Sequence, residues 1–283
     1  MSTTEPLKLE RMAWRWGTDR TSSLAARPVH LALPSHSAGR RGYTPPMNDF
    51  PATDFFDLTG FEHAGLFADN APVWAALSEP LDRHLAAWPC WRVQSEIPPG
   101  VHVVEGPVSV APGCRIEPGV VLRGPLIIGE GCEIRTGAYL RGGVVLGRNC
   151  IVGAHTEIKR AILLDGAHAP HQNYVGDSIL GRRVNLGAGT ILSNVKNIGR
   201  EVTFPHAGTV IRTGLRKFGS VLGDDCKTGC NSVLNPGILL GPGSVTYPCV
   251  CLRSGCYPPR TLVKLRQNQQ RVELAEVLQR LPG

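Results

Sequence analysis

The stretch VLRGPLIIGEGCEIRTGAYLRGGVVLGRNCIVGAHTEIK (residues 121–159) carries an aliphatic side chain at every sixth position. The same spacing extends in both directions and gives eleven such residues in succession: Val104, Val110, Ile116, Leu122, Ile128, Ile134, Leu140, Leu146, Val152, Ile158 and Leu164. In six of the eleven repeats, a glycine or asparagine follows three residues later, and both tolerate positive φ. A period of six fits neither an α-helix nor a flat strand. It predicts a solenoid of hexapeptide repeats, with three short strands in each coil.

The stretch GAHAPHQNYVGD (residues 166–177) interrupts this pattern. Leu164 and Leu180 are sixteen residues apart, where two hexads need twelve, so we expect four extra residues to loop outward at a corner. The spacing then resumes at Leu180, Leu186 and Leu192, and again at Leu222, Thr228, Leu234, Leu240, Thr246 and Leu252. Residues 195–220 between the two runs fit no hexad and predict a second excursion.

Composition divides the chain into four segments. Residues 1–46 carry many Arg, Ser and Pro, which predicts a disordered tail or a start codon assigned upstream of Met47. Helical spacing of apolar residues predicts a helical cap at 47–96, covering the first coil. The solenoid is expected over 97–257, followed by a C-terminal helix at 258–283 that packs along it.

The formal net charge of +7 suits either a small anionic ligand or nucleic acid, and only clustering of the charges separates the two. No apolar run reaches membrane-spanning length, and no stretch is typical of a secretory signal. An odd number of cysteines, nine, without an export signal predicts reduced thiols in the cytoplasm. We expect no membrane partner, and we expect a small anionic ligand rather than nucleic acid.

Residues eighteen apart stack on successive coils and form columns. Cys114, Cys132 and Cys150 form one column, which we interpret as small apolar core residues rather than a metal or redox ladder. The later cysteines lack paired CxxC spacing, so no zinc site is expected from them.

A second column contains Arg123, Arg141 and Lys159. Cations stacked this closely repel each other by about 1 kcal/mol even in water. An anion such as phosphate would turn that repulsion into charge-assisted hydrogen bonds, so the column predicts an anion site. His171 and Tyr174 follow in the interrupted segment and are candidates for chemistry beside it.

The segment EIKRAILLDGAHAPHQNYVGDSILGRRVNLGAGTILSN (residues 157–194) resembles the acetyltransferase domain of the bifunctional N-acetylglucosamine-1-phosphate uridyltransferase/glucosamine-1-phosphate N-acetyltransferase family. The similarity spans roughly residues 104–266. Its Lys-x11-His-x2-Tyr-x10-Asn arrangement is more specific than the hexads alone. The resemblance implies an all-β fold, a left-handed parallel β-helix.

The resemblance also assigns roles at the acceptor side of the site. Arg141 and Lys159 fall where the family binds the sugar phosphate, and Tyr174 falls where a hydroxyl assists them. His171 matches the general base. This implies acetyl transfer from acetyl-CoA to the amine of an amino-sugar 1-phosphate, in the synthesis of a nucleotide sugar such as UDP-N-acetylglucosamine. Glucosamine 1-phosphate is the expected acceptor, and galactosamine 1-phosphate is the nearest alternative.

Further roles concern the acyl group and the donor. Asn185 and Asn194 match asparagines that hold sugar and acyl groups. Ala188 lies where the backbone meets the acyl donor, and Arg266 matches a basic contact to the phosphate of the coenzyme. Backbone N–H groups of LGAGT (residues 186–190) are expected to stabilise the oxyanion. The resemblance implies a homotrimer with the donor between neighbouring chains, and no metal.

The chain departs from the family in three respects. Val195 follows Asn194 where the bifunctional members have tyrosine, and Arg200 stands where they have a lysine that binds substrate. A Gly-rich nucleotidyltransferase loop is missing, so uridylyl transfer is not expected.

Two other interpretations remain open. The chain could be a non-catalytic solenoid that binds a sugar nucleotide or a partner, with Val195 and Arg200 marking a decayed site. Alternatively His155, His168 and His171 could hold zinc, as histidines do in β-helix carbonic anhydrases.

Overall fold

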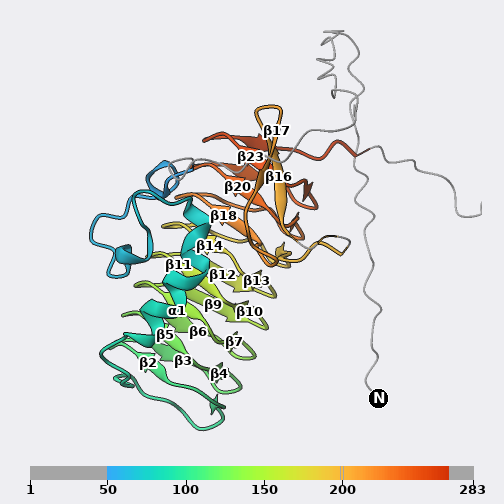
Figure 1. Ribbon diagram of the computed structural model, residues 1–283. Coiled ribbons are helices and arrows are strands. Elements are labelled where there is room, and N and C mark those ends of the chain that lie inside the picture. Colours follow the sequence, from blue (N-terminus) through green and yellow to red (C-terminus); the bar gives the residue numbers. More distant parts are fainter. Residues whose placement is uncertain (1–49, 198, 200, 268–283) are drawn as a thin grey trace, which may run out of the picture. The chain divides into compact units, whose positions relative to one another are not determined.

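The computed structural model describes residues 50–197, 199 and 201–267. In this part of the chain, short parallel strands stack coil upon coil into a left-handed parallel β-helix (Figure 1). The predicted fold is therefore confirmed. The predicted segment 1–46 lies outside the described residues.

Three walls form the solenoid, two of them being continuous sheets of eight strands. Sheet 1 contains β1 (His102–Val103), β4 (Val121–Arg123), β7 (Tyr139–Arg141), β10 (Glu157–Lys159), β13 (Tyr174–Gly176), β15 (Ile191–Leu192), β19 (Val233–Leu234) and β22 (Cys251–Leu252). Sheet 2 contains β2 (Val108–Val110), β5 (Leu126–Ile128), β8 (Val144–Leu146), β11 (Ala161–Leu163), β14 (Ile179–Leu180), β18 (Ser220–Leu222), β20 (Ile238–Leu240) and β23 (Gly255–Tyr257).

The third wall is less regular. It contains β3 (Arg115–Ile116), β6 (Glu133–Ile134), β9 (Ile151–Ala154) and β12 (His168–His171), followed by the separate pair β21 (Val245–Thr246) and β24 (Leu262–Val263). Single bridges through Asn185 and Lys227 join the two groups. Leu262 and Val263, expected in a C-terminal helix, belong to strand β24 instead, because they pair with β21 and complete one more coil. Residues 268–283 of that predicted helix lie outside the described residues.

The interior of the solenoid holds the aliphatic residues of the hexads. Nine of the eleven in the first run, from Val110 to Ile158, are almost completely buried in one cluster, as are the leucines of the second run. The two threonines of that run, Thr228 and Thr246, are buried as well. Val104 is an exception, since it is 51% exposed and its neighbour Val103 stands in register with Leu122. The cysteine column also lies in this core, with Cys132 and Cys150 fully buried, which confirms the structural interpretation.

The interrupted segment does not loop out of the solenoid, so this prediction was wrong. Ile158 pairs with Val175, and the coil between them has seventeen residues instead of eighteen. One residue, Arg160, connects β10 to β11 where two glycines connect β7 to β8. Leu163 therefore takes the interior position expected for Leu164. The small Ala169 fills the next interior position, which the aliphatic pattern had missed.

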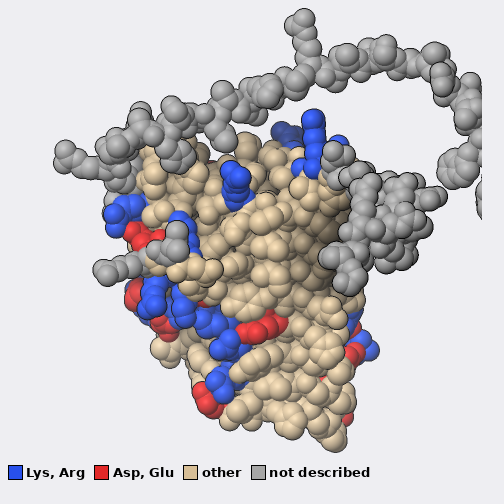
Figure 2. Space-filling model, turned by 90° about the vertical axis from the view of Figure 1, so that its right-hand side faces the viewer, with Lys and Arg blue, Asp and Glu red and all other residues tan. Residues whose placement is uncertain are grey.

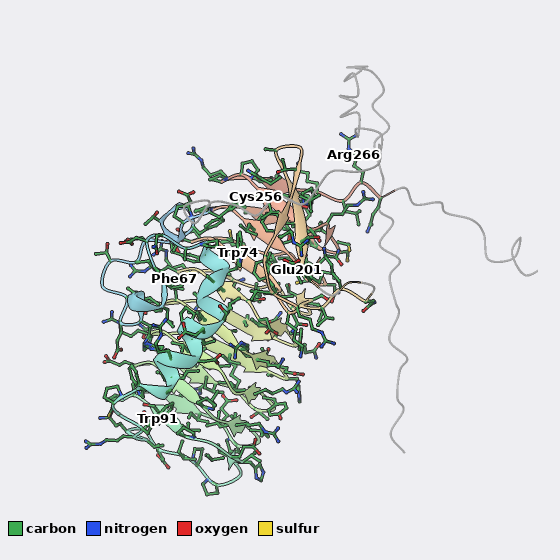
Figure 3. The ribbon with its side chains drawn as sticks, in the orientation of Figure 1. Phe67, Trp74, Trp91, Glu201, Cys256 and Arg266 are labelled. Atoms are coloured by element: carbon green, nitrogen blue, oxygen red, sulfur yellow. The ribbon has the colours of Figure 1, made fainter. Side chains whose placement is uncertain are left out.

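The N-terminal cap contains three 3-10 turns and one helix: η1 (Ala52–Asp54), η2 (Ala64–Leu66), η3 (Val73–Leu77) and α1 (Glu79–Ala86). It covers the outer face of sheet 2 across many coils rather than the first coil, which corrects the predicted position (Figures 1 and 3). The reason is that sheet 2 is apolar on both faces. Its outward residues pack against cap residues such as Trp74: they are Ile127, Val145, Ile162, Ile179, Val221 and Leu239.

The second excursion, between β15 and β18, is confirmed. It contains an antiparallel hairpin of β16 (Thr203–His206) and β17 (Thr209–Arg212). Phe204 and Ile211 of the hairpin join the apolar cluster under the cap. Among the described residues, no helix has the length and apolar character needed to cross a membrane.

Candidate functional site

The outer face of sheet 1 carries the charged residues that the sequence singled out. Side chains alternate along each strand, so Leu140 and Ile158 point inward while Arg141 and Lys159 point outward. Arg123 stands in register with Arg141, and β10 pairs beside β7 in the same way. The stacking of this cation column (Arg123, Arg141 and Lys159) is confirmed. Figure 2 shows Lys and Arg side chains gathered in a band across one face, with a few acidic groups among them.

Each member of the cation column has an acidic partner. The ion pairs are Arg123–Glu105 at 3.8 Å, Arg141–Glu157 at 2.6 Å and Lys159–Asp177 at 3.7 Å. The carboxylates offset part of the repulsion that the sequence predicted. An anion at this face would therefore bind mainly to the cations that keep side-chain N–H donors not used in these ion pairs.

Lys159 has an unusual environment. Burial, above all, lowers the pKa of Lys159 from its ordinary value, and the neighbouring Lys217 and Arg141 lower it further, whereas Asp177 opposes them. Lys217 belongs to the second excursion, and sequence reasoning missed it. The available signal was its position in "RKFG" (216–219), directly before the hexads resume.

Tyr174 and Asn194 meet over Gly176. A Cβ atom at Gly176 would lie 2.7 Å from the Tyr174 hydroxyl oxygen and 2.8 Å from Asn194 Nδ2, so any larger residue there would displace these two side chains. Asn194 Nδ2 donates a hydrogen bond of 2.5 Å to Asp177 Oδ2. The structure thus brings the predicted Lys159, Tyr174 and Asn194 together, and adds Asp177. We call these four residues and Lys217 the acceptor cluster.

Burial also acts on the phenol of this cluster. It raises the pKa of Tyr174, and the carboxylates of Glu157 and Asp177 raise it further, while Arg141 and the neighbouring Asn194 side chain lower it. Tyr174 therefore keeps its proton at neutral pH and can donate it in a hydrogen bond to an anion.

His171 stands at the corner that leads from the third wall into sheet 1. Its side chain is exposed, and within the described residues its ring makes no hydrogen bond. The backbone is fixed instead, because the His171 N–H donates to Asn173 Oδ1 and its carbonyl accepts from Gly189 N–H. Tyr174 is three positions after His171, so their Cα atoms are at most about 10 Å apart. This separation is within the size of a monosaccharide phosphate.

Ala188 occupies the same corner one coil further along, since Gly189 follows it and bonds to His171. The N–H groups of the other four residues in LGAGT (186–190) already donate to backbone carbonyls. Among the described residues, the Ala188 N–H has no acceptor. Of the five N–H groups expected to stabilise the oxyanion, the N–H of Ala188 is therefore the one that remains available, at the corner next to that of His171.

The other predicted residues lie apart from this cluster. Asn185 bridges His168 and Lys227 on the third wall. Arg266 is exposed and forms no ion pair with the acceptor cluster (Figure 3). Arg200 lies outside the described residues. Over residues 50–267, with 198 and 200 left out, no three His, Cys, Asp or Glu side chains form a group that could hold a metal ion, so the zinc interpretation gains no support.

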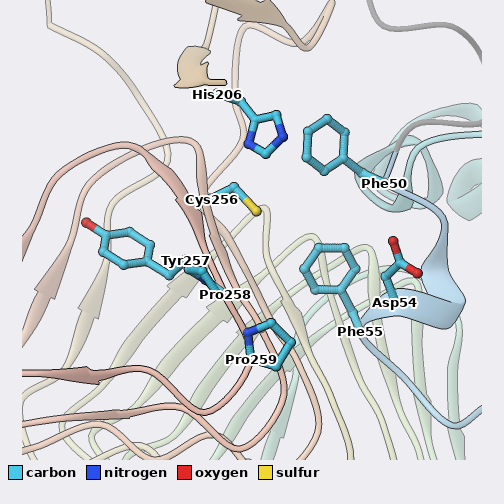
Figure 4. Close-up of a pocket in the computed structure, with 9 residues that line it drawn as sticks. Phe50, Asp54, Phe55, His206, Cys256, Tyr257, Pro258 and Pro259 are labelled. Carbon is cyan, nitrogen blue, oxygen red and sulfur yellow. The ribbon is translucent and has the colours of Figure 1, made fainter. Parts of the chain in front are cut away.

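A separate pocket of about 440 Å³ lies between the cap, the hairpin and the last coil (Figure 4). Phe50, Phe55, His206 and Tyr257 are among its lining residues. Its one thiol is Cys256, whose pKa is raised by burial, so it is a poor nucleophile. No residue predicted for the site lines this pocket.

Comparison with known proteins matches the part of the solenoid that carries the candidate site. Residues 122–242 match the family described as the GMPPB C-terminal domain. The chain is 37% identical over 97 residues to the bifunctional sugar-1-phosphate nucleotidylyltransferase/acetyltransferase of Sulfurisphaera tokodaii. It is 42% identical over 94 residues to the bifunctional protein GlmU of Methanococcus vannielii. The alignments cover 34% and 33% of this chain but only 24% and 22% of the relatives. The chain thus spans about a quarter of the length of these relatives, and the expected resemblance is confirmed.

Two solved structures also match this chain, both with low TM-scores. A putative acetyltransferase from Bacillus cereus has a TM-score of 0.33 at 16% identity, over 64% of this chain and 88% of that one. A hexapeptide transferase family protein from Anaplasma phagocytophilum has a TM-score of 0.32 at 16% identity, over 64% and 89%.

Proposed function

We propose that this protein transfers an acetyl group from acetyl-CoA to the amine of an amino-sugar 1-phosphate, with glucosamine 1-phosphate as the expected acceptor. The observation that carries the proposal is the acceptor cluster with His171 at the adjoining corner. It combines donors for a phosphate with an exposed base. The similarity to sugar-1-phosphate acetyltransferase proteins supports the same reaction.

The phosphate would bind at Lys159 and Lys217, with Tyr174 as a further donor. Burial beside Lys217 makes the charged form of Lys159 costly in the empty site. A phosphate dianion removes that cost, because it supplies the opposite charge that a single carboxylate, Asp177, supplies only in part. Ligand binding therefore favours two charged lysines, and holds the sugar against sheet 1.

His171 would then remove a proton from the acceptor's ammonium group, because only the free amine attacks a thioester. The exposed imidazole has no competing partner in the described part of the chain, so it is available to a ligand. As the amine attacks, the thioester carbonyl becomes an oxyanion. The N–H of Ala188, one coil along from His171, makes no hydrogen bond among the described residues and would donate to it.

The cellular setting and the role of the donor belong to the same proposal. Acetyl-CoA supplies the acyl group, and no metal has a part in the steps. All nine cysteines are free thiols, which supports a reducing compartment, the cytoplasm.

The test is acetylation of a panel of amino-sugar 1-phosphates, with the product detected by mass spectrometry. Release of coenzyme A thiol is a poorer readout here, because Cys230, Cys249 and Cys251 are exposed and react with the same reagents. Glucose 1-phosphate, which lacks the amine, is the matched control. Binding without any acetylated product across the panel would refute the proposal and favour a non-catalytic, sugar-binding solenoid.

A further inference from the structure

Asp177 is an unexpected neighbour for a phosphate site. Its side chain is almost completely buried, with the residue 3% exposed, and it lies at the corner between β13 and β14. Its backbone is left-handed, with φ of 44°. A carboxylate here repels a bound phosphate. The carboxylate is not needed merely to neutralise the charge of Lys159, because solvent and counter-ions can neutralise it.

The hydrogen bonds around Asp177 have a fixed direction. An ionised carboxylate only accepts, so the group of Asn194 that faces Asp177 Oδ2 must be its NH₂. The Tyr174 hydroxyl oxygen and the same NH₂ both lie over Gly176, so the phenol is next to the amide at this face. The contact with Asp177 therefore fixes which end of the Asn194 amide faces the carboxylate.

This arrangement has two consequences for the side of the cluster that a ligand would contact. With its NH₂ turned toward Asp177, the Asn194 amide has its Oδ1, an acceptor, on the opposite side. The Tyr174 hydroxyl lies over the same glycine and donates no hydrogen bond among the described residues, so its O–H is free to donate. The site thus presents a donor from Tyr174 next to an acceptor from Asn194.

We propose that Asp177 is a positioning residue that orients the Asn194 amide beside the Tyr174 hydroxyl, so that the site selects a ligand carrying an anion next to an N–H or O–H donor. This inference rests on the proposed function and deepens it, because an amino-sugar 1-phosphate has its amine beside its phosphate. A sugar phosphate without a donor at that place would leave the Oδ1 of the buried Asn194 unpaired. We expect such a ligand to bind about ten-fold more weakly.

The experiment measures the affinities of three ligands by calorimetry: glucosamine 1-phosphate, 2-deoxyglucose 1-phosphate and inorganic phosphate. In Asp177→Asn, the residue at 177 can donate as well as accept, so Asn194 can turn over. The preference for glucosamine 1-phosphate over the deoxy sugar should shrink from about ten-fold to about two-fold. Inorganic phosphate should bind more tightly, by about three-fold or more, because a nearby negative charge is gone.

A purely structural role makes a different prediction, namely weaker binding of all three ligands. The double variant Asp177→Asn with Asn194→Asp further distinguishes the positioning role of Asp177 from a purely structural role. It restores a hydrogen bond between positions 177 and 194, but the carboxylate introduced at position 194 then accepts from Tyr174 and removes the free donor. We expect it to fold, by thermal unfolding, and to bind phosphate more weakly than the wild type. Asp225→Asn, at an exposed ion pair with Arg183, is the control and should change nothing.

The outcomes separate this inference from the proposed function. If the wild type binds with the stated preference but makes no acetylated product, the proposed function fails and the inference stands. If Asp177→Asn keeps the preference, or if the double variant binds like the wild type, the inference is overturned. If the wild type binds none of the three ligands, both are overturned.

Discussion

Lys159 and Asp177 are joined twice, by a backbone hydrogen bond from Asp177 N–H to the Lys159 carbonyl at 3.0 Å and by an ion pair at 3.7 Å. They occupy successive coils at the place where the solenoid shortens from eighteen to seventeen residues per coil. Because Lys159 stands in register with Gly176, the next residue, Asp177, lies at the following corner, where its carboxylate is within ion-pair distance of the ammonium group.

Replacing Lys159 by alanine should weaken acceptor binding by about 1.5–3 kcal/mol, the value of one charge-assisted hydrogen bond. The effect should appear in KM for the sugar phosphate rather than in kcat, since the contact is made in both ground and transition states. Steady-state kinetics of Lys159→Ala measure it. Arg123→Ala, in the same column but two coils away, is the control. Equal KM values for Lys159→Ala and the wild type would show that the cation column is only a solvated surface and does not bind the phosphate.

His171→Ala should fold normally, because the side chain is exposed. Its turnover should fall about 10²–10⁴-fold, the range for losing a positioned base. The loss should shrink as pH rises, because more of the acceptor amine is then already deprotonated. His155→Ala, an exposed corner histidine of the preceding coil, is the matched control and should keep normal turnover. Near-normal turnover of folded His171→Ala at neutral pH would exclude the base role.

The protein should form a homotrimer. The cap covers the outer face of sheet 2, while the outer faces of sheet 1 and the third wall have no such cover from the described residues. Closed symmetry is the usual way for a chain to bury flat faces of this kind. Light scattering at micromolar concentration should give about three times the chain mass of 30.5 kDa. A mass of one chain would contradict the prediction.

Acid should weaken the cap through His63. This residue is buried, with Nδ1 3.1 Å from His84 Nε2. Burial, and to a lesser degree His84, lowers the pKa of His63 from 6.5 to about 4. The unfolded chain therefore binds the proton first, and stability that is complete above pH 6.5 is lost as pH falls toward 4. The loss amounts to at most about 3 kcal/mol.

Urea unfolding of the wild type and of His63→Gln at several pH values measures this dependence. Between pH 6.5 and 4.5, the free energy of unfolding should fall less steeply in the variant, which has no imidazole to protonate. His206, an exposed histidine, provides the control variant His206→Gln, whose slope should match the wild type. The same slope in His63→Gln and the wild type would rule out His63 as the source.

Arg160 should hold the cap on the solenoid. It forms two hydrogen bonds of 2.8 Å to the Asp82 carboxylate and bonds to the carbonyls of Leu77 and Ser78. Arg160→Ala should lower the free energy of unfolding by about 1.5–3 kcal/mol, because charged and partly buried contacts are lost together. Arg183→Ala, which breaks an exposed pair with Asp225, should cost about 0–1 kcal/mol. Equal losses in chemical denaturation would show that Arg160 makes no special contribution.

The sequence by itself determined the solenoid and most of the residues of the candidate site. Every coil repeats the same local geometry, so the interior positions recur at a fixed spacing that needs no knowledge of distant contacts. The motif from Lys159 to Asn194 likewise keeps its spacing along the chain, and the structure brings Lys159, Tyr174 and Asn194 together.

Only the tertiary structure decided features that depend on residues far apart. The sequence could not show that 166–177 is wall, because the small Ala169 breaks the aliphatic count while still filling an interior position. It could not place Lys217 beside Lys159, since an excursion of variable length carries it there. Nor could it locate the cap on sheet 2, or show that Ala188 alone within 186–190 has an N–H that makes no hydrogen bond to the described residues. Each of these follows from contacts between separate coils, which hydrophobic spacing along one chain does not record.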